Sequence, residues 1–217
     1  MSSISPVVIS CHNDNMVGIL HGSDVDANVG IVIIVGGPQY RVGSHRQFVL
    51  LARDFANVGF PVLRFDFRGM GDSSGAFREF EAVGDDIRAA IDCFYEQHRS
   101  LRHVVLFGLC DAASASLMYA HEDPRVLGLV LVNPWARTDA GEARAFLRHY
   151  YFSRFLQKSF WRKVFSGEFR IGDSFRDLAR KVVRAGDSVG ARNTTDESFL
   201  VRMRTGVENF TGKILLI

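Results

Sequence analysis

The chain has 217 residues, of which 47% are hydrophobic and 23% charged, with 26 Lys and Arg against 24 Asp and Glu. This hydrophobic fraction excludes a disordered chain, and the length is sufficient to bury one large core. The formal net charge of +2 is too small for a dedicated nucleic-acid binder, so we expect no nucleic-acid partner.

The sequence also argues against membrane spans and a disulfide scaffold. No apolar run approaches the ~20 residues of a transmembrane helix, and residues 1–8 lack the basic start and long apolar stretch of a secretory signal. The three cysteines, Cys11, Cys93 and Cys110, are too few for a disulfide framework and odd in number. We therefore expect a cytoplasmic protein.

Strand-like and helix-like segments alternate over most of the first 132 residues. In chain order we expect strands over 7–10, 16–20, 30–35, 60–65, 103–107 and 126–132, and helices over 44–58, 83–94 and 111–120. This alternation predicts an α/β fold in which a mostly parallel central sheet carries helices on both faces.

An aromatic, basic segment then interrupts the alternation. Nine aromatic residues fall within 146–169, and 141–181 carries ten Lys and Arg against four Asp and Glu. We interpret 139–193 as a helical lid inserted into the core, whose first part is 1–138 and whose return is 194–217.

The return to the core begins with a helix signal. Thr194 and Glu197 have the spacing of a capping box. The helix that they open is expected to turn Phe199, Leu200, Met203 and Val207 inward. Residues 213–217 (KILLI) then start a strand.

The sharpest motif places a cysteine between a strand and a helix. Gly108, Cys110 and Ala112 resemble the G-x-S-x-G nucleophile elbow, with Cys in place of Ser and Ala in place of the last Gly. We predict that Cys110 is the catalytic nucleophile, favoured by the partial positive charge of the helix N-terminus. Cys11 and Cys93 are expected to be buried structural cysteines.

Two backbone N–H groups are expected to form the oxyanion hole. The first belongs to Asp111, which follows the nucleophile and whose carboxylate we expect to point outward. The second comes from the loop GGPQYR after strand 30–35. Pro38 has no N–H, so Gly37 or Gln39 is the donor.

Polar residues near this loop have two interpretations. Arg41, His45 and Arg46 either bind an anionic group at the site or solvate the start of a helix, and charges at a helix edge favour the second. The motif DFRGMGDS, residues 66–73, has the glycines and polar residues of a tight turn, and we interpret it as architectural.

Together these motifs resemble the α/β-hydrolase family called exosortase A system-associated hydrolase 1. The resemblance rests on GGPQYRVGSHRQF, FDFRGMGDSSG, GLCDAASA, LVNPWARTD and the lid stretch LRHYYFSRFLQKSFWRKVFSGEF, and it covers nearly the whole chain. It implies an α/β-hydrolase fold with a helical lid, and a cytoplasmic enzyme found alongside exosortase, PEP-CTERM sorting and exopolysaccharide genes.

The α/β-hydrolase pattern also places an acid and then a histidine after the nucleophile in chain order. Among the seven histidines only His149 follows a candidate acid, and it falls in the insertion. Asp139 is an alternative acid. We therefore expect a C-terminally truncated hydrolase that is inactive alone, with its acid, histidine and last strands beyond Ile217.

For the intact enzyme we predict acyl transfer to water, with Cys110 attacking an ester or thioester. Tyr151, Phe155 and Trp161 of the lid are the expected substrate contacts. The cations of the lid suit an acyl group linked to coenzyme A or an acidic carrier protein, or contact with a lipid surface. The scattered His and Cys positions predict no metal site, and we expect no cofactor.

Two other functions are compatible with the fold class. The first is a non-catalytic α/β-hydrolase-like module that binds a ligand or partner through the lid. The second is a nucleotide-binding doubly wound domain, which is disfavoured because Gly36, Gly37 and Gly43 match neither G-x-G-x-x-G nor the P-loop spacing.

Overall fold

The computed structural model of the chain describes residues 3–22, 26–37, 39–136 and 193–217. In the last of these ranges it describes side chains only from Phe199 onward. The chain divides into two compact units, one formed by Met1–Trp135 and Arg202–Ile217 and the other by Ala136–Val201. The second unit lies almost entirely outside the described residues, so the predicted lid boundaries at 139 and 193 stay predictions.

The first unit is built on a seven-stranded sheet with the order β1-β2-β4-β3-β5-β6-β7. β1 pairs antiparallel with β2, and β2 with β4, whereas every other neighbouring pair is parallel. The strands are β1 (Ile4–Cys11), β2 (Asp14–His21), β3 (Val29–Ile34), β4 (Val62–Phe65), β5 (His103–Leu109), β6 (Val126–Val132) and β7 (Lys213–Leu216).

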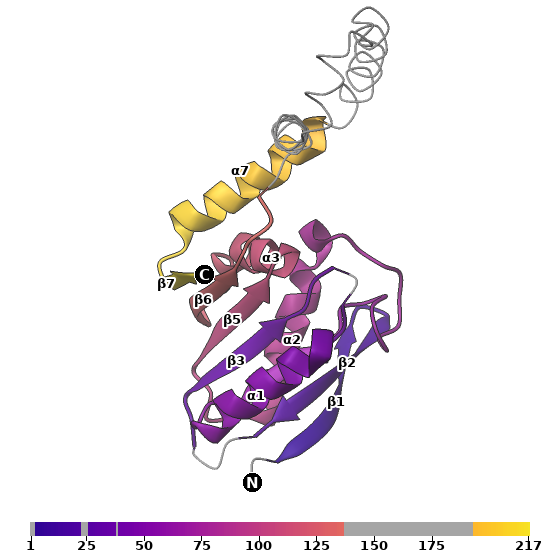
Figure 1. Ribbon diagram of the computed structural model, residues 1–217, viewed down its shortest axis with the longest axis vertical. Helices are drawn as coiled ribbons and strands as arrows, with labels where there is room; N and C mark the ends of the chain where they lie inside the picture. The colour runs from indigo at the N-terminus through magenta and orange to yellow at the C-terminus, as the bar shows by residue number, and fades with distance from the viewer. Residues whose placement is uncertain (1–2, 23–25, 38, 137–192) are drawn as a thin grey trace, which may run out of the picture. The chain divides into compact units, whose positions relative to one another are not determined.

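Helices cover both faces of this sheet (Figure 1). α1 lies on one face, where Phe48 and Ala52 pack against Ile31 and Ile33 of β3, and α2 and α3 lie on the other. The mostly parallel α/β sheet predicted from the sequence is therefore confirmed. The helices are α1 (Gln47–Asn57), preceded by a 3-10 turn (Ser44–Arg46), α2 (Gly84–Gln97), preceded by a 3-10 turn (Phe80–Ala82), α3 (Asp111–Ala120) and α7 (Asn193–Asn209).

The ends of the elements differ from the sequence expectation in small, explicable ways. The β1–β2 loop is only His12–Asn13, because Asp14 and Asn15 continue the ladder. Val207 of α7 is exposed, contrary to the prediction that it faces inward. Gly206 lies at the inward position instead. It packs so closely on α3 that a Cβ there would collide with the Leu117 carbonyl oxygen.

The turn DFRGMGDS is held at both ends. Asp66 is fully buried, and its backbone carbonyl accepts a hydrogen bond from Ser73 Oγ at 2.8 Å. Arg68, also buried, donates from Nε to Asp86 of α2 at 2.6 Å. These contacts close the turn on itself and tie it to α2, in agreement with its interpretation as architecture.

β7 forms the edge of the described sheet, next to β6, and its side chains are exposed.

No helix within the described ranges has the length and apolar character needed to span a bilayer.

Candidate active site

The site is built on the sharp turn between β5 and α3. Cys110 has φ 60° and ψ −122°, a conformation that costs a non-glycine residue on the order of 1–3 kcal/mol. Its N–H donates to the Val132 carbonyl of β6 at 2.9 Å, which extends the parallel pairing to the turn. A Cβ at Gly108 would lie 2.7 Å from the Ala112 carbonyl oxygen, so this position accepts only glycine without a shift.

Trp135 is tied to the same turn. Its N–H donates to the Cys110 carbonyl at 3.2 Å, and its carbonyl accepts from Ser114 Oγ of α3 at 2.7 Å. Trp135 stands just beyond β6, the neighbour of β5, and parallel strands bring their carboxyl ends to one edge of a sheet. The position of Trp135 directly after β6 could therefore have suggested that it lies beside Cys110, but the sequence analysis did not single it out.

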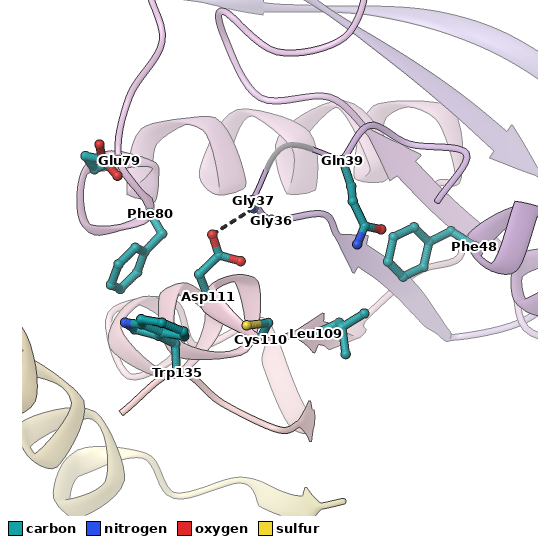
Figure 2. A pocket seen from close by; sticks show the side chains of 10 residues that line it. All are labelled: Gly36, Gly37, Gln39, Phe48, Glu79, Phe80, Leu109, Cys110, Asp111 and Trp135. Atoms are coloured by element: carbon teal, nitrogen blue, oxygen red, sulfur yellow. Dashed lines mark hydrogen bonds between the residues drawn. The ribbon is translucent and has the colours of Figure 1, made fainter. Parts of the chain in front are cut away.

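A cavity of about 450 Å³ opens over the turn. Figure 2 shows Phe80 and Trp135 on one side of Asp111 and Cys110, and Phe48, Leu109 and Gln39 on the other. A mainly apolar wall around a few polar groups is typical of sites for small organic ligands. The lining residues are Gly36, Gly37, Gln39, Phe48, Glu79, Phe80, Leu109, Cys110, Asp111 and Trp135.

The side chain of Asp111 corrects one sequence expectation. We expected it to point outward, but its Oδ2 accepts the Gly37 N–H at 2.7 Å (Figure 2), and its Oδ1 accepts the Ala112 N–H at 3.0 Å. Gly36 makes this possible, because a Cβ on that residue would collide with Asp111 Oδ1. The carboxylate therefore turns into the site, toward the loop after β3.

The structure brings all three predicted oxyanion-hole residues to the cavity. Gly37 has φ 60°, and its N–H is engaged by Asp111. Gln39 lines the wall, with its side-chain Oε1 3.4 Å from Gln47 Nε2. The Asp111 N–H lies in the first turn of α3, where N–H groups have no intrahelical acceptor. Pro38 lies outside the described residues.

Arg41 departs from the solvating role that we favoured. Its guanidinium pairs with Asp66 and, at 2.6 Å, with Asp72. Burial alone would lower the pKa of Arg41, but hydrogen bonds to Asp72 and Asp66 raise it above its usual value. His45 and Arg46 are exposed, as the solvating interpretation requires.

The other two cysteines differ from Cys110 in their surroundings. Cys11 is buried beside Asp86, and burial, together with that carboxylate, raises the pKa of its thiol to about 11. Cys93 in α2 is only partly buried, contrary to the sequence expectation, and this partial burial still raises the pKa of its thiol. Both thiols therefore stay protonated at neutral pH, and neither lines the cavity.

No histidine is among the described residues that line the cavity. His149, the alternative acid Asp139 and the predicted substrate contacts Tyr151, Phe155 and Trp161 lie outside the described residues. Within the part of the chain that the structure does describe, no three His, Cys, Asp or Glu side chains group as metal ligands.

The mostly parallel sheet and its helices agree with the comparison with protein families. The family described as "serine aminopeptidase, S33" matches residues 27–208, most of the chain. The chain belongs to this α/β-hydrolase family. The family name specifies a serine, whereas this chain carries Cys110 at the turn between β5 and α3.

Solved structures share the fold of this chain at low sequence identity. An esterase of Pyrococcus furiosus, Pf2001, matches with a TM-score of 0.65 and 15% identity over 99% of this chain and 69% of its own. DcsB, solved in complex with its substrate analogue, matches with a TM-score of 0.57 and 21% identity over 67% of this chain and 50% of its own.

A third structure is Est1E from Butyrivibrio proteoclasticus with bound ferulic acid, with a TM-score of 0.53 and 18% identity over 66% of this chain and 56% of its own. The chain thus spans between half and about two thirds of the length of these three proteins. Among the curated proteins, none matches it.

Proposed function

We propose that this chain is the core of a hydrolase that transfers an acyl group from an ester or thioester to water through Cys110. The observation that carries the proposal is the positive φ of Cys110 at a strand-to-helix turn that opens into a cavity of about 450 Å³. Such a turn holds the nucleophile away from the backbone of both elements, where a bound carbonyl can reach it.

The chemistry divides into two steps. The Cys110 thiol gives up its proton to solvent as its sulfur forms a bond to the substrate carbonyl carbon, whose π electrons move to oxygen. The oxyanion then collapses and expels an alkoxide or thiolate, which takes up a proton. Water attacks the resulting thioester and releases the acid and the free thiol. Backbone N–H groups of Asp111 and of Gly37 or Gln39 are the candidate oxyanion donors.

Both steps are faster with a base beside the thiol, and no described cavity residue is a histidine. We therefore expect the described part of the site, without a base from elsewhere, to be acylated slowly at Cys110 and to turn over poorly. The second step needs the base most, because water is a weaker nucleophile than a thiolate.

The apolar wall of the cavity, with Phe48, Phe80, Leu109 and Trp135, favours an apolar acyl group. The solved structures named as esterases support an ester as substrate. A thioester linked to coenzyme A or a carrier protein, contact of the lid with lipid, and a cytoplasmic role beside an exosortase system remain part of the proposal from the sequence.

A direct test is to incubate the 217-residue chain with p-nitrophenyl butyrate or with a butyryl thioester and to locate the acyl group by peptide mass spectrometry. We expect one butyryl group on Cys110. Cys11 and Cys93 serve as internal controls, because burial raises the pKa of both thiols. Cys110→Ala should abolish the modification and the release of p-nitrophenolate.

The alternative function, a non-catalytic binding module, predicts a different outcome. It retains the cavity but does not require a reactive sulfur. Labelling of Cys110 no faster than that of Cys11 would therefore exclude the enzymatic proposal in favour of the binding module.

A further inference from the structure

We propose that the Asp111 carboxylate is an internal cap on the oxyanion hole, which competes with the carbonyl oxygen of the substrate for the Gly37 N–H. The inference rests on the proposed function, because it assumes that Cys110 attacks a carbonyl group. Under this proposal Asp111 has two opposed effects on the oxyanion hole. Its backbone N–H is a donor to the substrate oxygen, and its carboxylate occupies the Gly37 N–H.

The cap joins two segments that are 74 positions apart in the sequence. Oδ2 of Asp111 accepts the Gly37 N–H at 2.7 Å, within the range of hydrogen bonds to an ionised acceptor. Oδ1 accepts the Ala112 N–H at 3.0 Å in the first turn of α3. Both carboxylate oxygens are thus held by backbone donors, one from the loop after β3 (Figure 2) and one from α3.

The space for this carboxylate is provided by two consecutive glycines. A Cβ on Gly36 would collide with Asp111 Oδ1 and lie 2.7 Å from the Ala112 nitrogen. Gly37 has φ 60°, a left-handed conformation that glycine adopts without strain, and its N–H is directed at Asp111. Larger residues at Gly36 would exclude the carboxylate from the place that it occupies.

The position that the Asp111 carboxylate occupies is also suitable for an oxyanion. It combines a loop N–H with the N-terminal end of a ten-residue helix, whose partial positive charge stabilises anions. Because Asp111 already supplies a negative charge there, a developing oxyanion at Cys110 meets repulsion as well as an occupied donor. The carboxylate must turn away before the Gly37 N–H can hold the substrate oxygen.

A purely structural hydrogen bond would have the opposite consequence. If Asp111 only anchored the loop, its removal would let Gly37 drift and would weaken oxyanion binding. If Asp111 is a cap, its neutralisation strengthens oxyanion binding. The sign of the effect therefore separates the two interpretations.

Butanal is a suitable probe, because the oxygen of its adduct with Cys110 competes with the Asp111 carboxylate for the Gly37 N–H, and no turnover is required. The Cys110 sulfur adds to the aldehyde carbon, the π electrons move to oxygen, and the thiol proton is transferred to that oxygen, which gives a neutral hemithioacetal without any oxidant. We expect Asp111→Asn and Asp111→Ala to bind butanal about tenfold more tightly than the unmodified chain, measured by titration. Cys110→Ala should not form the adduct.

Glu79→Gln is the matched control for charge. Glu79 lines the same cavity, so this variant removes one negative charge from the wall and leaves the Asp111–Gly37 hydrogen bond in place. We expect it to change the butanal affinity less than Asp111→Asn does. Far-ultraviolet circular dichroism of each variant verifies that the fold is retained.

Amide hydrogen exchange of Gly37, followed by NMR, tests the cap without any ligand. We expect this amide to exchange about tenfold faster in Asp111→Ala than in the unmodified chain, because its acceptor is lost. Unchanged exchange of Gly37, or weaker binding of butanal by a folded Asp111→Asn variant, would overturn the proposal. Failure of esters to acylate Cys110, with the exchange and butanal results as expected, would instead reject the proposed function alone.

Discussion

Arg41 holds the loop that carries Gly37 through both its side chain and its backbone. The guanidinium pairs with Asp66 and Asp72, the N–H donates to Asp66, and the carbonyl accepts from Arg64 Nη1 at 2.9 Å. Asp66 is buried, so its carboxylate oxygens depend on these partners for hydrogen bonds. A single residue thus connects the loop after β3 with the turn after β4 and with the sheet itself.

We predict that Arg41→Met lowers the free energy of unfolding by about 2–4 kcal/mol, because the buried Asp66 carboxylate loses its cation. Arg41→Lys should cost less, since it keeps the charge but not the two-pronged geometry. Asp72→Asn is the control, with a loss below about 1 kcal/mol, because Asp72 is exposed. Urea denaturation followed by circular dichroism measures all three, and an Arg41→Met loss equal to that of Asp72→Asn would contradict the prediction.

At the scale of elements, Asp86 joins three segments behind the site. It lies in the first turn of α2 and is fully buried. It accepts from the backbone N–H of Arg68 at 2.9 Å, from the Arg68 guanidinium, and at 3.6 Å from the Cys11 thiol of β1. The helix, the turn after β4 and the N-terminal hairpin are therefore connected by one carboxylate.

Replacement of Asp86 by Asn should be among the most damaging single changes in the fold. It leaves the Arg68 cation buried without a counter-charge, which typically costs about 3–5 kcal/mol. Asp85→Asn, one residue earlier, removes an exposed pair with His12 and should cost about 1 kcal/mol or less. Thermal unfolding of both variants provides the comparison. Similar melting temperatures would show that the buried ion pair of Asp86 and Arg68 contributes no more to stability than the exposed pair of Asp85 and His12.

On the scale of the whole molecule, stability should depend on pH through His21. This side chain is fully buried on β2 and accepts from Arg64 Nε at 2.9 Å. Burial, with the nearby charges of Arg64 and Arg53, lowers its pKa to about 4. The folded protein thus keeps His21 neutral over a range where the unfolded chain, with a pKa near ~6.5, binds a proton.

The unfolded state binds more protons between about pH 6.5 and pH 4, so the stability contributed by neutral His21 is present above this window and is lost as the pH falls through it. We expect a loss of about 2–3 kcal/mol across the window, measured by urea denaturation at several pH values. His21→Gln has no titrating ring and should show a correspondingly flatter profile. Parallel profiles for the two proteins would show that another group is responsible.

Local sequence patterns were sufficient for the sheet, its helices and the cysteine turn. Continuous apolar runs such as β3 and β6 predict strands buried on both faces, and the small residues around Cys110 predict a close crossing of strand and helix. Each of these signals depends on neighbours within a few positions. The alternation of elements then leaves few topologies, which explains why the fold class was predicted correctly.

The direction of side chains at the site was decided only by the tertiary structure. Asp111 turns inward because Gly36 and Gly37, brought from a distant loop, offer space and a donor, and nothing beside Asp111 in the sequence indicates them. Arg41 finds its carboxylates after β4, and Phe80 reaches the cavity from a turn before α2. The sequence by itself determined which residue stands at the strand-to-helix turn. The packing of distant segments determined what surrounds it, because hydrogen bonds and buried charges depend on spatial neighbours and not on chain neighbours.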